Sequence, residues 1–404
     1  MHAILDLFGL ALAVGAAIGS CYILFFAVAG SRMANRTDRR KAKIGRYPRF
    51  LVFVPAHDEE NGILPTISSI LGMNYPRAKF DVVVIADNCT DRTAEVAAQA
   101  GADVWIREDR KNPGKGQALA WAFHKARHHP FDLVVIIDAD SEAEPEFLAR
   151  IAAQVMTRTG METEVVYQGR YDFAPAKAIS GWFEALSVAA KAAENSFVYR
   201  PRSRAGLVNL LQGNGFCIPR RVLDRVPFRS TSIVEDAEYA VTLALNGIPV
   251  CYVEEACVRA RMTQTIRDAA PQRLRWASGI FHLMFRAVPK LLWCGVVRRD
   301  WKLVEAALML VLTSRLILVY LTFASLGIAF FATRQDFAWV VFILCLLSVT
   351  AQACYLWLMC RIADSESFTV QRLVFLPVYL LFVALAQIAS LTGLRRRHWA
   401  RTSR

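Results

Sequence analysis

Carboxylates placed directly after an apolar strand give this sequence its clearest chemical signal. Asp138-Ala139-Asp140 continues without a break from Leu133–Ile137, an apolar run rich in Val and Ile that is typical of a buried strand. Two carboxylates at positions i and i+2 can converge on a hard divalent cation that is shared with a diphosphate. We expect Asp140 to ligate Mg²⁺ or Mn²⁺ directly, with Asp138 beside it. A plain acidic loop is the alternative, but it explains poorly why Asp138 adjoins an apolar strand.

A second acidic pair, Glu235-Asp236, stands near the start of a predicted helix. We expect this helix to open at Ser232, to run to about Asn246 and to stop at Gly247. Ser232 and Glu235 have the spacing of a capping box, which would give Glu235 a structural role. The Asp236 carboxylate is then left available for chemistry.

Two glycine-containing segments can bring the backbone close to a ligand. Asn112-Pro113-Gly114-Lys115-Gly116 lies between a predicted strand and a predicted helix, and it does not match the P-loop pattern. The second segment is Gln212-Gly213-Asn214-Gly215. A simple turn remains the alternative for both.

The elements that must position these groups form an alternating series. Short apolar runs rich in Val and Ile, Phe50–Val54, Val82–Ala86 and Leu133–Ile137, are separated by helix-like stretches at 61–73, 91–100 and 116–127. This alternation predicts an α/β sheet covered on both faces, which binds ligands at the carboxyl ends of its strands. Asp87, at such an end, is therefore a candidate ligand contact, with an Asx turn as the alternative.

The string Gln272-Arg273-Leu274-Arg275-Trp276 combines a phosphate-binding group with a sugar-binding group. A helical backbone would place Gln272, Arg275 and Trp276 on one face. Trp276 can stack on the apolar face of a sugar, and Arg275 can pair with phosphate in a bidentate manner. An amphipathic helix at a membrane surface is the alternative.

Together, these acidic motifs and the Gln/Arg/Trp string resemble those of the processive inverting glycosyltransferases of family 2, which include cellulose, chitin and hyaluronan synthases. The resemblance covers roughly Arg49 to Trp276. It implies an α/β, Rossmann-like glycosyltransferase-A domain in the cytoplasm, flanked by transmembrane helices. Val234 stands where the family usually has Thr, which weakens the match but leaves the acidic pair intact.

The resemblance also implies a role for each candidate residue. Asp236 is expected to be the general base, and Mg²⁺ or Mn²⁺ the cofactor, held by Asp140 and Asp138. The implied contacts to the nucleotide-sugar donor are Asp87, Lys115, Asp138 and Arg275. The implied contacts to the acceptor are Gly213, Asn214, Gln272 and Trp276.

Hydropathy predicts a membrane protein. The chain is 55% hydrophobic with a mean hydropathy of +0.30. Its uncharged runs, Leu7–Ser31, Leu316–Thr333, Phe337–Cys360 and Leu373–Leu394, are each long enough to cross a bilayer. The first run is expected to be a retained anchor rather than a signal peptide, because no Lys or Arg precedes it and it is too long.

The positive charge lies beside the predicted membrane segments. The net charge is +13, and almost all of it lies in two segments, Arg32 to Arg49 and the tail from Arg395 to Arg404. A nucleic-acid binder would carry this charge on its folded body, so nucleic acid is excluded as a partner. The first basic cluster predicts a cytoplasmic catalytic segment and an external N-terminus. Four spans would then place the basic tail outside the cell, although Lys and Arg are usually in excess on the cytoplasmic side. A re-entrant C-terminal run would remove this conflict.

We therefore divide the chain into an anchor (1–31), a basic linker (32–48), a catalytic domain (49–270), the Gln/Arg/Trp segment with interface helices (271–302), about three transmembrane helices (303–394) and a basic tail (395–404). The expected function is transfer of a sugar, from a UDP-sugar, to a growing polysaccharide at the bacterial inner membrane. Addition of one sugar to a lipid-linked acceptor is the alternative. Membrane lipids and an export or regulatory subunit are the further expected partners. A transporter is disfavoured because the spans hold almost no ionisable residues.

Overall fold

The computed structural model describes residues 2–33, 46–158, 164–174, 181–229, 232–261, 266–312, 315–331, 335–362 and 374–391. Most of the first basic cluster and the whole basic tail lie outside these residues.

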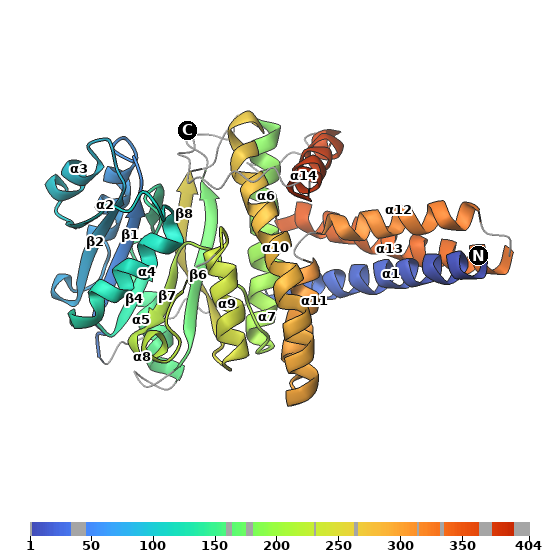
Figure 1. The fold of residues 1–404 in the computed structure, drawn as a ribbon, viewed down its shortest axis with the longest axis horizontal. Coiled ribbons are helices and arrows are strands. Elements are labelled where there is room, and N and C mark those ends of the chain that lie inside the picture. The colour runs from blue at the N-terminus through green and yellow to red at the C-terminus, as the bar shows by residue number, and fades with distance from the viewer. Residues whose placement is uncertain are drawn as a thin grey trace.

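One mixed sheet of eight strands forms the centre of the catalytic domain (Figure 1). Its order is β3-β2-β1-β4-β7-β6-β8-β5, and β3, β2, β1 and β4 run parallel while β7 is antiparallel to β4. The strands are β1 (Phe50–Ala56), β2 (Phe80–Asp87), β3 (Asp103–Arg107), β4 (Leu133–Ile136), β5 (Ser141–Ala143), β6 (Val166–Ala174), β7 (Phe216–Pro219) and β8 (Val250–Arg261). The predicted α/β fold of the glycosyltransferase-A type is confirmed.

The parallel strands are buried on both faces. Along β1, Leu51 and Phe53 join the core on one side of the sheet, whereas Phe50, Val52 and Val54 join the core on the other. Successive side chains of a strand point to opposite faces, so a strand covered on both sides must be apolar throughout. This requirement explains the continuous apolar runs in the sequence.

Helices connect the strands and cover both faces of the sheet. They are α2 (Ile63–Leu71), α3 (Thr93–Gln99), α4 (Lys115–Lys125), α5 (Phe147–Arg158), α6 (Trp182–Glu194), α7 (Arg200–Arg204), α8 (Arg220–Arg225) and α9 (Glu235–Leu245). A π-helical turn, η5 (Asn195–Tyr199), joins α6 to α7.

Three helices project from the domain as a bundle: α1 (His2–Met33), α12 (Leu316–Phe330) and α13 (Gln335–Ile362) (Figure 1). Hydroxyl groups bond between them, with Ser20 Oγ 2.8 Å and Thr322 Oγ1 3.1 Å from Ser348 Oγ. Interhelical polar bonds of this kind are usual in membrane bundles, where lipid offers no alternative partner.

The remaining apolar helices lie against the catalytic domain. They are α10 (Ile266–Arg298), α11 (Trp301–Leu312) and α14 (Leu376–Leu391). Figure 1 shows α10 and α11 running across the direction of the bundle. α14 packs on α6 and α10, and the rings of Trp182 and Phe375 stack at 5.1 Å beside it.

By length and composition alone, α1, α10 and α13 are each able to cross a membrane, and α11 with α12 would form a fourth span bent by 77°. α10 contains two prolines and carries charged residues along its length.

A buried polar cluster connects α1 to the rest of the protein. The Arg202 guanidinium, 1% exposed, donates from Nη2 to Glu305 Oε2 at 2.8 Å and from Nη1 to the Tyr22 hydroxyl at 2.6 Å. The backbone of α1 also meets η5 directly, because a Cβ on Gly30 would lie 2.0 Å from the carbonyl oxygen of Ser196.

Candidate active site

The sheet brings three motif segments to one edge. Ala56 of β1 pairs with Ala86 of β2, and Phe53 of β1 pairs with Ile136 of β4, so these strands end at similar levels. The segments that follow them carry His57, Asp87 and Asp138. His57 Nδ1 lies 2.7 Å from the Asp87 carbonyl oxygen, which joins the first two segments directly.

Lys115 lies at the centre of the site. It is the first residue of α4, and its ammonium group pairs with the Asp138 carboxylate and donates to the Gly213 carbonyl at 2.6 Å. Burial by itself would lower the pKa of Lys115, but the carboxylates of Asp138, Glu235 and Asp236 raise it above its ordinary value. The ammonium group therefore remains charged and gathers three motifs that are distant in the sequence.

Gly213 and Asp236 are in direct contact. Gly213 has a φ of +74°, and a Cβ there would lie 2.9 Å from Asp236 Oδ2. A side chain would thus be both strained and obstructed at this position. The close approach lets the Asp236 carboxylate reach the same space as the Lys115 ammonium, 3.7 Å from the same Cβ position.

Burial gives both members of the acidic pair unusual pKa values. It raises the pKa of Glu235 from its ordinary 4.5 to about 7, with Lys115 opposing the rise. Burial also raises the pKa of Asp236, again opposed by Lys115. A carboxylate with a raised pKa is a stronger base than one in water, as general-base catalysis requires.

The predicted capping box is wrong. α9 begins at Glu235 and its N-cap is Val234, two residues after the expected N-cap Ser232, with no side-chain capping bond. Glu235 is therefore the first helical residue rather than the fourth position of a box. Glu235 is 8% exposed, and its carboxylate interacts electrostatically with Lys115 instead of capping the backbone N–H of Ser232.

Asn214 joins the acidic loop to the glycine segment. Its side chain is 1% exposed, accepts from the Asp138 N–H at 3.1 Å and donates to Ser141 Oγ at 2.8 Å. The fully buried Gln168 of β6 supports it by donating to the Asn214 carbonyl at 2.9 Å. Through these bonds, Asn214 positions the acidic loop that contains Asp138 and Asp140. Sequence reasoning missed Gln168, whose only signal is a Gln within an otherwise apolar start of a strand.

Asp87 is fully buried at the end of β2. Its carboxylate pairs with the Arg107 guanidinium and accepts from the Gly114 N–H at 3.3 Å. It thereby holds the loop that precedes Lys115. Sequence reasoning did not find Arg107, the partner that makes this burial tolerable.

The acidic loop has the donor set for a hard cation. Asp140 is partly buried and accepts from Ser141 Oγ at 2.8 Å, while the Asp138 side chain is 29% exposed. Both offer carboxylate oxygens from one short turn, the ligand type that Mg²⁺ and Mn²⁺ prefer. These residues fit a divalent cation that completes its ligands with phosphate oxygens.

α10 brings the Gln/Arg/Trp string toward the acidic pair. Arg275 Nε is buried and has no hydrogen-bond partner within the described residues. Burial lowers the pKa of the Arg275 guanidinium, and Glu235 and Asp138 oppose this effect. A buried donor without a partner is uncommon, and an anionic ligand would satisfy it. Gln272 and Trp276 are partly exposed on the same helix, and the Arg273 guanidinium lies 5.8 Å from the Trp276 ring centroid.

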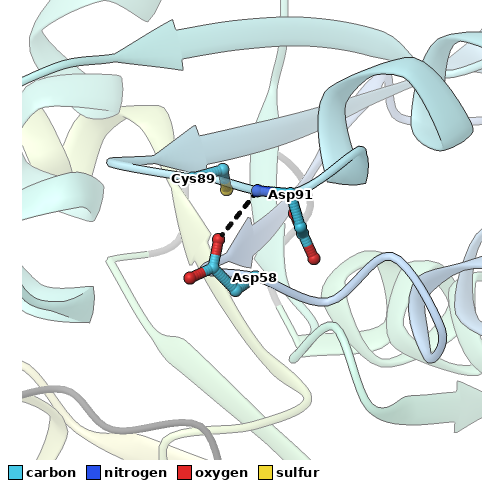
Figure 2. A group of neighbouring side chains, drawn as sticks. All are labelled: Asp58, Cys89 and Asp91. Atoms are coloured by element: carbon cyan, nitrogen blue, oxygen red, sulfur yellow. Dashed lines mark hydrogen bonds between the residues drawn. The ribbon is translucent and has the colours of Figure 1, made fainter.

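A separate group, Asp58, Cys89 and Asp91, has ligand atoms within 4.8 Å of one another (Figure 2). Its carboxylates are occupied by backbone donors. Asp58 Oδ1 accepts from the N–H groups of Thr90 at 2.6 Å and Asp91 at 3.3 Å, and Asp91 Oδ1 accepts from the Thr93 N–H at 2.9 Å. We interpret this group as a set of hydrogen bonds that holds two loops together, and not as a metal site.

A family model described as "Glycosyltransferase like family 2" matches residues 48–279, which is more than half of the chain. The chain belongs to this family. The matched region contains all the motif segments described above and ends at Gly279 in α10.

Several family members are similar to this chain. A beta-monoglucosyldiacylglycerol synthase of Synechocystis is 25% identical over 236 residues, covering 58% of this chain and 48% of that protein. A poly-beta-1,6-N-acetyl-D-glucosamine synthase of Staphylococcus epidermidis is 23% identical over 274 residues, covering 67% and 63%. The chain spans about half the length of most relatives it matches.

A solved structure supports the fold across nearly the whole chain. It is a mannosyltransferase of Pyrobaculum calidifontis in complex with GDP-Man and Mn²⁺. The TM-score is 0.57 at 19% identity, covering 95% of this chain and 99% of that one. At this identity the likeness extends to the fold alone.

Proposed function

We propose that this family 2 glycosyltransferase is a membrane-bound inverting enzyme that moves a sugar from a nucleotide sugar, expected to be a UDP-sugar, to a growing polysaccharide. One observation carries the proposal. Asp138, Gly213 and Asp236 meet at the Lys115 ammonium, so the candidate groups for the donor, the acceptor and proton transfer share one space.

In the proposed reaction, Asp236 accepts the proton of an acceptor hydroxyl. The hydroxyl oxygen forms a bond to the anomeric carbon, and the bond from that carbon to the diphosphate breaks, with its electron pair leaving on the diphosphate. Lys115 and Arg275 offset the negative charge that develops there. A divalent cation bound by Asp138 and Asp140 would supply further stabilisation of the leaving diphosphate. The structural neighbour is in complex with GDP-Man and Mn²⁺, which supports a divalent cation as the cofactor of the proposed reaction.

The acceptor is proposed to reach the site along α10, with a sugar stacked on Trp276 and Gln272 beside it. The named relatives include both a polymer synthase and a synthase of a glycolipid. Addition of one sugar to a lipid-linked acceptor therefore remains the second candidate.

The bundle supports a membrane location and a simpler topology than four spans. If α1, α12 and α13 cross the membrane and α14 stays beside α10, the chain crosses three times. An external N-terminus then places everything after α13 in the cytoplasm. This topology reconciles the basic tail with the usual excess of Lys and Arg in the cytoplasm.

The proposal is tested by measuring nucleotide release from purified membranes across a panel of nucleotide sugars and then sizing the product. A ladder of long products that Trp276→Ala shortens would support the polymerase. Loss of an indole face removes on the order of one to a few kcal/mol of acceptor binding at each cycle, from about 25 cal/mol per Å² of buried apolar surface. A single product of fixed size in the wild type would instead support addition of one sugar. If no nucleotide sugar in the panel gives more nucleotide release than membranes that lack the protein, both candidate functions would be overturned.

A further inference from the structure

A lysine that the proposed reaction does not use is buried near the C-terminal end of α6. Lys191 is 9% exposed. Its ammonium group donates to Gln212 Oε1 at 2.6 Å and to Glu194 Oε2 at 2.9 Å, and it lies 4.6 Å from the centroid of the Tyr171 ring. An ammonium group is costly to bury unless it is paired, and these contacts offset that cost. Of the three partners, Gln212 is the one that belongs to a motif segment of the candidate active site.

Gln212 immediately precedes the glycine at the centre of the site. The Gly213 carbonyl accepts from the Lys115 ammonium at 2.6 Å, and a Cβ on Gly213 would lie 2.9 Å from Asp236 Oδ2. A glycine with a φ of +74° has no side chain that could fix its position. The neighbours of Gly213 must therefore hold its backbone in place.

The main chain on both sides of Gly213 is held by one side chain of β6. Gln168, which is fully buried, accepts from the Gln212 N–H at 2.9 Å and donates to the Asn214 carbonyl at 2.9 Å. These two bonds bracket Gly213. They fix the height of the segment above the sheet but do not involve the side chain of Gln212.

The side chain of Gln212 is held at both ends of its amide. Oε1 accepts from Lys191 Nζ, and Nε2 donates to Asn195 Oδ1 at 3.4 Å. Asn195 is 3% exposed and is itself fixed, because it donates to the Tyr171 carbonyl at 2.9 Å and to Asp172 Oδ1 at 2.7 Å. The bond from Lys191 is the shorter of the two and is charge-assisted, so it provides the stronger hold.

We propose that Lys191 is a positioning residue for sugar transfer, which acts through Gln212 to keep the backbone of Gly213 beside Asp236. This inference rests on the proposed glycosyl transfer and adds a residue that does not touch the reacting groups. Two ammonium groups, those of Lys115 and Lys191, thus hold two successive residues of one segment. The first holds a carbonyl within the site, and the second holds a side chain outside it.

The first test compares turnover with donor binding. Turnover is measured as nucleotide release from membranes that hold equal amounts of each variant, with the nucleotide sugar that gives the greatest release in the panel. Lys191→Met should lower turnover about tenfold or more, since small displacements of catalytic groups are costly. The KM for the nucleotide sugar should change by less than about threefold, because the impaired step follows donor binding. Unchanged turnover would overturn the inference.

A double-mutant cycle tests whether Lys191 acts through Gln212. Gln212→Ala should lower turnover about as much as Lys191→Met does. The double variant should be no more than about twofold slower than Gln212→Ala, because the bond is already lost in either single variant. Losses that multiply in the double variant would show that the two side chains act independently, and the proposed connection would be wrong.

Gln212→Glu separates the two ends of the amide. A glutamate has the same reach and still accepts from Lys191, but it has no N–H group to donate. We expect this variant to keep turnover within about threefold of the wild type, because the charge-assisted bond remains. In the Lys191→Met background the same change should give no recovery, since it buries a carboxylate without its cation. A loss as large as that of Gln212→Ala would contradict the role given to Lys191.

Two controls exclude a general effect on folding. Glu194→Gln breaks an ion pair of Lys191 but leaves its bond to Gln212, so turnover should stay within about twofold of the wild type. Lys125→Met removes an ammonium group that lies 4.8 Å from the Trp105 ring centroid, and it should also retain turnover. A loss in Glu194→Gln as large as in Lys191→Met would mean that Lys191 only stabilises α6, and the inference would be refuted.

The wild type distinguishes failure of this inference from failure of the proposed function. If the wild type releases nucleotide from no nucleotide sugar, the proposed glycosyl transfer fails and the role of Lys191 fails with it. An active wild type whose turnover is unaffected by Lys191→Met would refute the positioning role alone.

Discussion

Gly279 of α10 lies directly against Val234, the residue before the acidic pair. A Cβ on Gly279 would come within 2.6 Å of Val234 Cγ1 and 3.1 Å of Val234 Cγ2. The helix that carries Arg275 and Trp276 therefore packs on the side chain of the residue that precedes α9. The positions of Arg275 and Asp236 are coupled through this contact.

Gly279→Ala should lower sugar transfer, because Val is stiff at χ1 and the added methyl group must displace α10 or the start of α9. We expect a loss of about tenfold or more in kcat/KM, since small misplacements of catalytic groups are costly. Gly327→Ala is the control, because Gly327 of α12 has open space around its Cβ position. Equal activity of the two variants would show that the contact at Val234 can relax.

Asp236→Asn should cut transfer by at least about 10², because it removes the proposed base and keeps the shape of the side chain. The affinity for the donor, measured by nucleotide-sugar binding, should change little. Asp81→Asn, whose carboxylate is 40% exposed in a surface ion pair with Arg49, serves as control. A fall in donor affinity as large as the fall in turnover would make Asp236 a binding residue.

Asp140→Ala should abolish metal-dependent turnover while the protein still inserts in the membrane. Ala offers no oxygen ligand, so the leaving diphosphate would lose its cation. Glu142→Ala alters an acidic residue two positions away whose side chain is 51% exposed, and it should retain activity. Full wild-type activity in excess chelator would refute the metal assignment.

The wild-type melting temperature in detergent should fall as the pH rises from about 4.5 to 7. Burial raises the pKa of Glu235 to about 7 in the folded protein. Below 4.5 both states hold the proton, but between these values the unfolded state releases it first, so the free energy of unfolding decreases. The raised pKa of Asp236 acts in the same direction.

Glu235→Gln removes one of these titrations and should make the fall shallower. Glu95→Gln, which changes an exposed carboxylate on α3, should leave the slope as in the wild type. An identical slope in Glu235→Gln would indicate that this carboxyl is already ionised at low pH.

The three-span topology predicts opposite sides for the two ends of the chain. A cysteine placed at His2 should react with an impermeant thiol reagent in intact cells, whereas one placed at Ser403 should react only after permeabilisation. Both substitutions are made in a background in which the exposed Cys21 and Cys354 are replaced. Labelling of both positions in intact cells would favour four spans instead.

Sequence patterns predicted the parallel half of the sheet better than the rest. β1, β2 and β4 are apolar on both faces, so their runs of Val and Ile are evident. β6 and β8 contain polar and charged residues such as Gln168 and Arg259, whose bonds to Asn214 and Glu144 cross large sequence distances. Local patterns carry no information on such pairs, and the predicted strands therefore stopped at β4.

In the candidate site too, features that depend on a short stretch of sequence were predicted, and features that depend on distant residues were not. The acidic loop and the acidic pair were found because a charge beside an apolar segment is visible in one short window. The start of α9 was misplaced because Lys115, 120 residues away, and not a local cap, interacts with Glu235.

The contacts of α1 decide how this enzyme can be prepared without its membrane. Deleting α1 would remove the Tyr22 hydroxyl from the buried Arg202 and uncover the backbone of η5 where Gly30 meets Ser196. Both changes would expose polar groups that the folded chain hides, next to the helix that carries Lys191. A soluble version should therefore replace the lipid-facing side chains of α1 with polar ones and keep Gly30 and Tyr22, rather than truncate the helix.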